Sequence, residues 1–195
     1  MARCQNGPGR IESMKKLSKA FIAILVTAAG LIPVANHQKA DAFTKSYFEK
    51  VLDGYPAIQV LTKYGAKVIV KDSCKGDYYA LFNNFGPTGY LFICADKSNS
   101  LADFEASLTH EAIHFAQWCW GGSTLYIHDS LRKQAMKDGF STEWADEATN
   151  DYEKGTLEYE QEWEAYYMED ITPEELGEIV EEYCAPITQE EIDKV

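Results

Sequence analysis

The chain has 195 residues, of which 31 are acidic and 18 basic, and its formal net charge is −13 with neutral histidines. So negative a chain offers no basic face for phosphate groups, which argues against a nucleic-acid partner. Its length allows a leader peptide followed by one ordinary domain with a buried core.

The first 42 residues have the layout of a secretory signal peptide. Three lysines between residues 15 and 19 form a positive region, residues 20–35 form a short apolar run, and residues 40–42 read Ala-Asp-Ala, a cleavage site before Phe43. An uncleaved membrane anchor is the alternative, which Pro33 and the shortness of the run disfavour. We therefore expect an exported protein, secreted or periplasmic, with no stable membrane anchor after cleavage.

Two further points concern this leader. Residues 1–13 read as an upstream extension, so the start codon is either Met1 or Met14. Cleavage after residue 42 removes six basic and two acidic residues and leaves residues 43–195 as a single domain, with 12 basic and 29 acidic residues and a net charge of −17.

The predicted domain contains four cysteines, Cys74, Cys94, Cys119 and Cys184. An even number in an exported chain predicts two disulfides, for which three pairings exist. We favour Cys74–Cys94, which would join neighbouring strands, and Cys119–Cys184, which would join two helices. No Cys-x-x-Cys pair is present, which argues against a cysteine zinc site.

The first half of the domain reads as helix followed by strands. Residues 44–64 are helical in pattern, with a break at residues 54–56. Three stretches rich in β-branched and aromatic residues follow, at 66–70, 78–82 and 90–95. Residues 83–89 are dense in turn formers, so we expect the last two strands to form a hairpin.

A well-delimited amphipathic helix is predicted next, from Leu101 to about Trp120. Ser100 with Asp103 resembles an N-terminal cap, with Ser98 a competing cap. Apolar residues recur at steps of three and four, and a Gly-Gly pair at 121–122 supplies the stop signal.

The remainder is predicted to be helical and acidic. A short helical pattern lies near residues 131–136, and a longer one runs from residue 141 or 142 to about 170, divided at Gly155-Thr156 with Thr156 as a cap. Thr172-Pro173-Glu174-Glu175 then begins a helix that ends near Cys184.

The middle of the Leu101–Trp120 helix carries His110-Glu111-Ala112-Ile113-His114. Residues four apart lie on one helix face, so the two imidazoles are placed to bind one zinc ion. The intervening Glu111 is placed to act as a general base toward a water on that ion. Such a zinc ion, Zn²⁺, is the cofactor that we expect.

A catalytic zinc needs a third protein ligand. A third histidine in the pattern H-E-x-x-H-x-x-G-x-x-H is absent, since Gln117 and Trp120 stand at the last two fixed places. The acidic run from residue 158 to 164 offers glutamates instead. We favour Glu162 over Glu158 and Glu160 because Ala165, one turn on, allows close helix approach.

The motif followed, 48 residues after His114, by Glu162-x-x-Ala165 resembles the gluzincin zinc metallopeptidases. The resemblance implies a small zincin-like α+β domain with an N-terminal helix, a three-stranded mainly antiparallel sheet, the motif helix and a C-terminal helical part. It also implies that an edge strand, residues 90–95, receives the backbone of a peptide or protein substrate. Tyr166 departs from the Asp or Asn that often follows the small residue.

The mechanism implied is hydrolysis of peptide bonds by a zinc-activated water, with Glu111 as the base. Tyr166, Tyr152 and His128 are candidates for stabilising the oxyanion, and Gln117 lies near the metal face as a possible partner of His114. The alternative is a disulfide-stapled exported binding or inhibitory protein with a structural or absent metal site.

Overall fold

The computed structural model describes residues 44–75, 78–85, 88–126, 133–135, 137, 140–141, 145–146 and 149–186. The predicted signal peptide and His128 lie outside these residues. Among the described helices, none combines the length and apolar character that crossing a membrane requires.

The described residues form an α+β arrangement, as predicted. In chain order the elements are α2 (Lys45–Asp53), α3 (Pro56–Lys63), β1 (Ala66–Lys71), β2 (Ala80–Phe85), β3 (Thr88–Cys94), α4 (Leu101–Cys119), α7 (Leu157–Tyr167) and α8 (Pro173–Cys184). The predicted break at residues 54–56 separates α2 from α3. Residues 133–135 and 145–146 are helical as expected, whereas residues 149–151 form a turn, and residues 142–144 and 147–148 lie outside the described residues.

The three strands form one sheet in the order β1-β3-β2. The predicted hairpin is confirmed, because β2 pairs antiparallel with β3 from Ala80–Ile93 to Phe85–Thr88. β1, however, pairs parallel with β3. The expectation of a mainly antiparallel sheet was therefore wrong, since one of its two pairings is parallel, and the strand expected at the edge lies at the centre.

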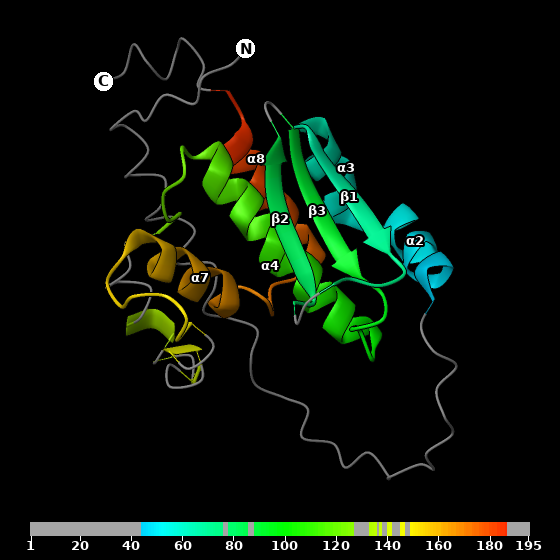
Figure 1. Cartoon of the computed structure of the whole chain (residues 1–195). Coiled ribbons are helices and arrows are strands. Elements are labelled where there is room, and N and C mark those ends of the chain that lie inside the picture. The colour runs from blue at the N-terminus through cyan, green and yellow to red at the C-terminus, as the bar shows by residue number, and fades with distance from the viewer. Residues whose placement is uncertain are drawn as a thin grey trace. The chain divides into compact units, whose positions relative to one another are not determined.

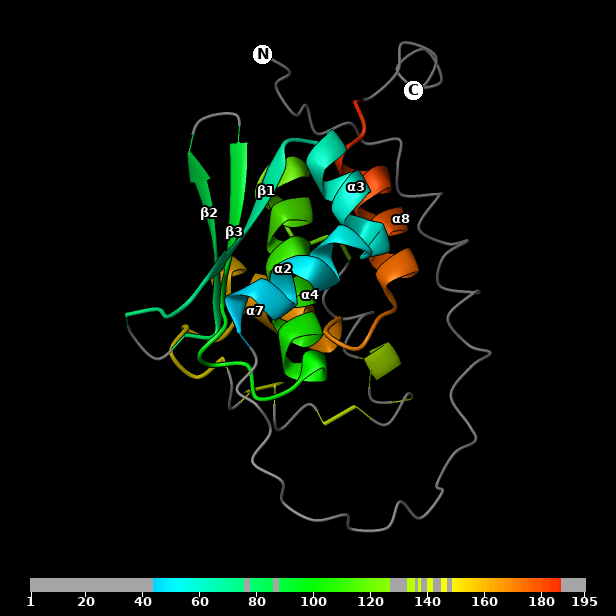
Figure 2. The same ribbon diagram turned by 90° about the vertical axis from the view of Figure 1, so that its right-hand side faces the viewer.

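The helices cover one face of this sheet (Figures 1 and 2). α4 packs against β2 and β3, α2 and α3 pack against β1, and α8 packs against α3 and α4 on the side away from the sheet. Gly89 in β3 permits this close approach, because a Cβ atom there would lie 2.5 Å from the Phe115 ring of α4. The motif helix thus packs tightly on the sheet, with Leu91, Ile93, Leu108 and Phe115 fully buried between them.

Local signals define both ends of α4. The Ser100 hydroxyl accepts a hydrogen bond from the Asp103 backbone N–H at 3.0 Å, so Ser100 is the cap. Ser98 instead donates to the Cys94 carbonyl. Gly121 and Gly122 follow the helix with φ values of 90° and 75°, a conformation that favours glycine.

Both predicted disulfides are present. Cys74–Cys94 joins the chain just after β1 to the end of β3, and Cys119–Cys184 joins the last residue of α4 to the last residue of α8. The predicted Thr172 capping box at the start of α8 is also confirmed. Cap and disulfide together fix α8 against the motif helix.

Candidate metal centre

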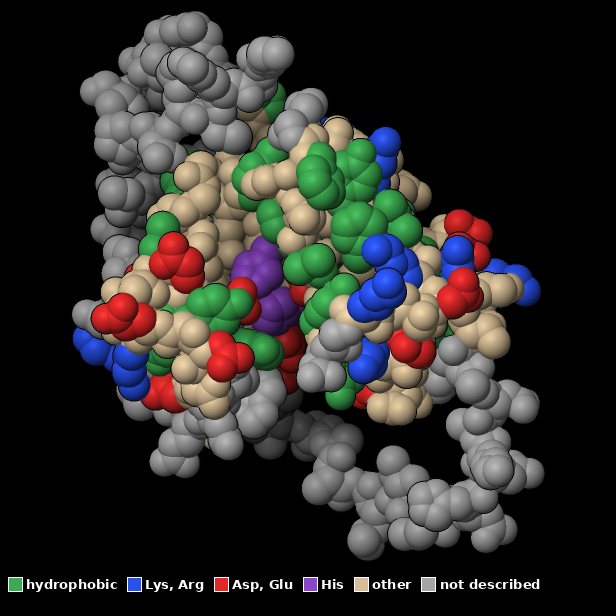
Figure 3. Space-filling view, in the orientation of Figure 1, with side chains coloured by type: hydrophobic (Ala, Val, Ile, Leu, Met, Phe, Trp, Pro, Cys, Tyr) green, Lys and Arg blue, Asp and Glu red, His purple; other side chains and the backbone are tan. Residues whose placement is uncertain are grey.

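The motif residues lie in the middle of α4, and α7 packs beside this helix on the side where β2 forms the edge of the sheet (Figure 1). His110 and Glu111 are 9% and 7% exposed, and His114 is half-buried. The histidine side chains nevertheless reach the surface at the centre of one face of the molecule (Figure 3). The centre is thus largely desolvated but accessible from that face.

The structure brings His110, His114 and Glu162 together. Nε2 of His110 lies 3.1 Å from Nε2 of His114. The Glu162 carboxylate places Oε2 3.3 Å from His110 Nε2 and Oε1 3.3 Å from His114 Nε2. Within the described residues, this is the only group of His, Cys, Asp and Glu side chains arranged to hold a metal ion. Glu158 and Glu160 do not take part in it.

These separations match the spacing of ligands around zinc. Zinc binds imidazole nitrogen and carboxylate oxygen at about 2.0–2.2 Å in tetrahedral geometry, which puts neighbouring ligand atoms about 3.3–3.5 Å apart. The observed separations of 3.1–3.3 Å lie close to that range. The residues present therefore fit a zinc ion.

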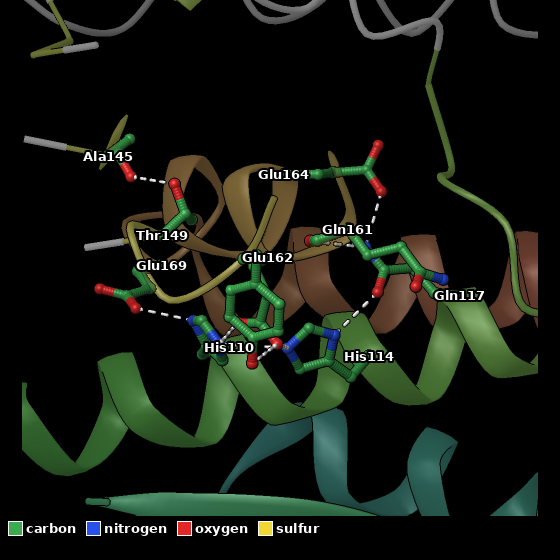
Figure 4. A network of polar contacts seen from close by, with 10 residues as sticks. His110, His114, Gln117, Ala145, Thr149, Gln161, Glu162, Glu164 and Glu169 are labelled. Carbon is green, nitrogen blue, oxygen red and sulfur yellow. Dashed lines mark hydrogen bonds and ion pairs between the residues drawn. The ribbon is translucent and has the colours of Figure 1, made fainter. Parts of the chain in front are cut away.

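A carboxylate that the sequence did not reveal orients His110. Glu169, in the turn after α7, places Oε1 2.9 Å from Nδ1 of His110 (Figure 4). Metal-binding histidines commonly donate their second ring N–H to such a carboxylate. Glu169 lies seven residues after Glu162 and outside the acidic run of residues 158–164 from which the ligand was chosen.

Gln117 orients the His114 ring in the same way, as its position one turn further along α4 suggested. Its Oε1 lies 2.8 Å from His114 Nδ1. Its Nε2 donates to the Gln161 backbone carbonyl at 3.0 Å and to the Glu164 carboxylate at 2.8 Å. The Gln161 carbonyl can only accept, which fixes the Gln117 amide with its NH2 group toward that carbonyl and its oxygen toward His114.

Glu164, one of the four glutamates of the acidic run, has a role that the sequence did not reveal. It is completely buried, and its carboxylate also accepts hydrogen bonds from the backbone N–H groups of Leu125 and Tyr126, both at 2.8 Å. Burial raises the pKa of Glu164 to about 7, although these hydrogen bonds counteract the rise. Glu164 thus joins α7, Gln117 and the segment after α4.

Glu111 lies beside β2. The Phe82 backbone lies close enough to its carboxylate to favour the charged form. Burial raises the pKa of Glu111, opposed by the nearby imidazoles of His110 and His114. A carboxylate with a raised pKa is better able to hold and return a proton near neutral pH.

Two of the candidate oxyanion-stabilising tyrosines contact the centre. The Tyr152 hydroxyl donates to Glu162 Oε1 at 3.1 Å, and the Tyr166 ring lies edge-on to the His110 ring with 4.6 Å between ring centres. Burial, together with nearby carboxylates such as Glu162, raises the pKa of both hydroxyls to about 12. Both therefore remain proton donors at neutral pH.

The charges of the centre are strongly coupled. Burial favours the neutral form of His110, but hydrogen bonds to Glu162 and Glu169 outweigh it and raise the His110 pKa from 6.5 to about 10. Burial acts against the charged form of Glu162, but hydrogen bonds from His110 and His114 outweigh it and hold the Glu162 pKa well below its usual range. The Glu162 carboxylate is thus arranged to stabilise a positive charge at Nε2 of His110.

The edge strand beside the candidate metal centre is not the one predicted. Residues 90–95 fall mainly in β3, which has a neighbour on each side and no free edge. β2 is the edge strand beside Glu111. The expectation that residues 90–95 form a substrate-binding edge was therefore wrong, because β1 pairs parallel with β3 and occupies its free side.

One comparison with known proteins matches the part of the chain that contains this centre. No curated protein and no solved structure matches the chain. A family model does match residues 93–185, from the end of β3 through α8, and this stretch includes every residue of the centre described above. Over that stretch the chain is similar to a domain of unknown function, DUF8637.

Proposed function

We propose that the protein is an exported zinc-dependent peptidase of the gluzincin type, with His110, His114 and Glu162 as ligands and Glu111 as general base. The observation that carries the proposal is the convergence of two imidazoles of α4 and the Glu162 carboxylate of α7. Their nearest atoms lie 3.1–3.3 Å apart, and their ligand atoms, one from each residue, all lie within 4.8 Å of one another. The resemblance of the motif supports the same assignment.

The hydrogen bonds around the imidazoles support a metal more specifically. Each Nδ1 faces an oxygen atom, of Glu169 or of Gln117, which accepts a hydrogen. In the neutral rings the hydrogen is therefore on Nδ1 and the Nε2 lone pair points inward. Two inward lone pairs and a carboxylate form a ligand set suited to zinc.

The chemistry that zinc supplies when bound is polarisation of the scissile carbonyl and a lowered pKa of water. Glu111 takes the proton of the attacking water and returns it to the leaving amine. Tyr152, whose hydroxyl donates to Glu162, and Tyr166, whose ring lies against His110, are the candidate donors to the developing oxyanion. Glu169 and Gln117 keep the imidazoles in position throughout.

β2 supplies a natural place for the substrate backbone. It is an edge strand and its Phe82 backbone contacts Glu111. An extended peptide lying alongside β2 would gain backbone hydrogen bonds and would pass the general base. Binding of the substrate backbone, which the sequence resemblance implies for residues 90–95, is therefore proposed for residues 80–85.

The substitution Glu111→Gln tests the proposal. It removes the base but preserves size, so zinc content and the two disulfides stay as in the wild type while hydrolysis of a mixed peptide library falls by about 100-fold or more. Glu160→Gln, on the neighbouring helix and outside the centre, is the matched control and retains full activity. Wild-type protein that binds zinc and cleaves no peptide would instead favour a binding or inhibitory protein with a structural metal.

A further inference from the structure

The sheet has an outer face, turned away from α4, that none of the described helices covers (Figure 2). Side chains alternate along a strand, so every second residue points to this face. The strand register assigns to it Lys67, Ile69 and Lys71 of β1, Tyr90 and Phe92 of β3, and Leu81, Asn83 and Phe85 of β2. We call these eight residues the outer sheet face.

The outer sheet face is largely apolar. Leu81 and Phe85 are 40% and 60% exposed. The Tyr90 and Phe92 rings lie nearly parallel with 6.0 Å between their centres, and Phe85 meets Tyr90 edge-on at 5.6 Å. A contiguous exposed surface of this kind is typical of an interaction site.

Its charge differs from that of the rest of the chain. The three strands contain no Asp or Glu, although the chain has 31 acidic residues. Lys67 and Lys71 extend over the Tyr90 and Phe92 rings, at 5.6 and 4.2 Å from the ring centres. Within the described part of the chain, no ion pair joins either lysine to a carboxylate. The face is therefore apolar and positively charged on a strongly negative molecule.

The outer sheet face begins next to the candidate metal centre. Phe82 contacts Glu111 through its backbone, and its neighbours Leu81 and Asn83 point to the outer face. Hydrophobic side chains lie beside the histidines at the surface, and basic side chains lie beyond them on the same side of the molecule (Figure 3). A polypeptide that reaches the centre along β2 would therefore have adjoining residues over this face.

Building on the proposed peptidase function, we propose that the outer sheet face binds a segment of the substrate that is both acidic and apolar. Apolar side chains of such a segment pack on Leu81, Phe85 and the stacked rings. Its carboxylates pair with Lys67 and Lys71, while the acidic helices repel it elsewhere and so confine it to this face. The substrates would then be polypeptides with acidic, apolar sequence near the cleaved bond.

Binding is measured with zinc-loaded Glu111→Gln protein, which keeps the peptide intact. The probes are fluorescein-labelled peptides in which Glu alternates with Phe, and matched peptides in which Lys replaces Glu or Ser replaces Phe. Fluorescence anisotropy should detect the Glu/Phe peptide at least about tenfold more tightly than either matched peptide, with binding that weakens as salt is raised.

Charge reversal identifies the face. Lys67→Glu with Lys71→Glu should weaken binding of the Glu/Phe peptide about tenfold or more. The control is Lys45→Glu with Lys50→Glu on α2, which changes the net charge equally, at one partly exposed and one exposed site, and should alter binding less than about twofold. Leu81→Ser with Phe85→Ser tests the apolar part, against Tyr47→Ser with Leu157→Ser, two exposed apolar residues elsewhere.

Equal affinity for the Glu/Phe and Lys/Phe peptides, equal effects of the two lysine pairs, or binding to phosphatidylglycerol vesicles in place of the peptides would overturn the inference. None of these results bears on zinc binding or on the cleavage of other peptides. Conversely, selective binding of the Glu/Phe peptide by wild-type protein that does not cleave it would support the outer sheet face and contradict the peptidase.

Discussion

Nε2 of His110 lies 3.1 Å from Nε2 of His114 on the next turn of α4, and Nδ1 of each ring faces an oxygen atom. Two nitrogen lone pairs directed at each other across this distance repel unless a cation lies between them. In the metal-free protein a proton on His110 takes the place of that cation, and the carboxylates of Glu162 and Glu169 stabilise the protonated ring. A zinc ion and that proton therefore compete for one place.

Competition of this kind predicts that zinc binding releases a proton. The His110 pKa of about 10 keeps the metal-free ring protonated at neutral pH. Binding of zinc should then release about one proton at pH 7, and the apparent affinity should rise about tenfold per pH unit from pH 7 toward 10. Calorimetric titration in buffers of different ionisation enthalpy measures the proton count, and a count of zero would refute the competition.

The same shift predicts how the stability of the metal-free protein depends on pH. His110 has a higher pKa in the folded chain than the ordinary 6.5, so its contribution to stability is complete below pH 6.5 and is lost as pH rises toward 10. Urea unfolding should show this loss in wild-type protein and not in His110→Gln. Saturating zinc should abolish it, because the ring is then held by the metal.

Glu162→Gln should abolish tight zinc binding. Loss of a group that only orients a ligand typically weakens binding about 10- to 100-fold, so loss of a ligand should cost more than about 100-fold. Glu160→Gln, two residues away on α7 and outside the donor group, is the matched control. Equal zinc affinity of the two variants would show that another residue completes the centre.

Substitution of a residue that orients an imidazole should weaken zinc binding less than loss of a ligand does, and should affect one ring only. Gln117→Leu removes the acceptor of His114 Nδ1 and should weaken zinc binding about 10- to 100-fold. Gln161→Leu is its control, since Gln161 takes part through its backbone carbonyl. Nitrogen-15 spectra of the imidazoles should show a changed His114 tautomer in Gln117→Leu and a changed His110 in Glu169→Gln, each leaving the other ring as it was.

Local features of this fold were predictable from sequence. The Ser100, Thr156 and Thr172 caps and the Gly121-Gly122 stop depend on residues within a few positions of one another, and each is where it was predicted. The helical spacing of His110 and His114 is equally local. Glu162 was identified because Ala165 follows it one turn later, and Ala165 is fully buried.

Features set by long-range packing were not predictable in this way. The parallel position of β1 beside β3 depends on how a distant strand returns to the sheet, and no signal within either strand specifies it. The roles of Glu164, within the acidic run, and of Glu169, after it, were missed because this part of the chain offers many carboxylates. Which of them point inward depends on where α7 lies against α4, information that the sequence of α7 alone does not contain.

The two disulfides should contribute unequally to stability. In the chain-entropy model, closing the 65-residue separation of Cys119–Cys184 contributes about 4 kcal/mol and the 20-residue separation of Cys74–Cys94 about 3 kcal/mol. Paired Ser substitutions compared by urea unfolding should reproduce that order. Cys119 also lies two residues beyond Gln117, so its loss should lower zinc affinity, and an unchanged affinity would show that the bridge and the centre are independent.

X-ray absorption at the zinc edge, on protein loaded with one equivalent of the metal, tests the central claim most directly. The account predicts one zinc per chain with two imidazole nitrogens and one carboxylate oxygen as its protein ligands, at about 2.0–2.2 Å. The imidazole signal should fall by half in His110→Ala or His114→Ala. A wild-type protein that binds no stoichiometric zinc, or whose spectrum contains no imidazole, would contradict it.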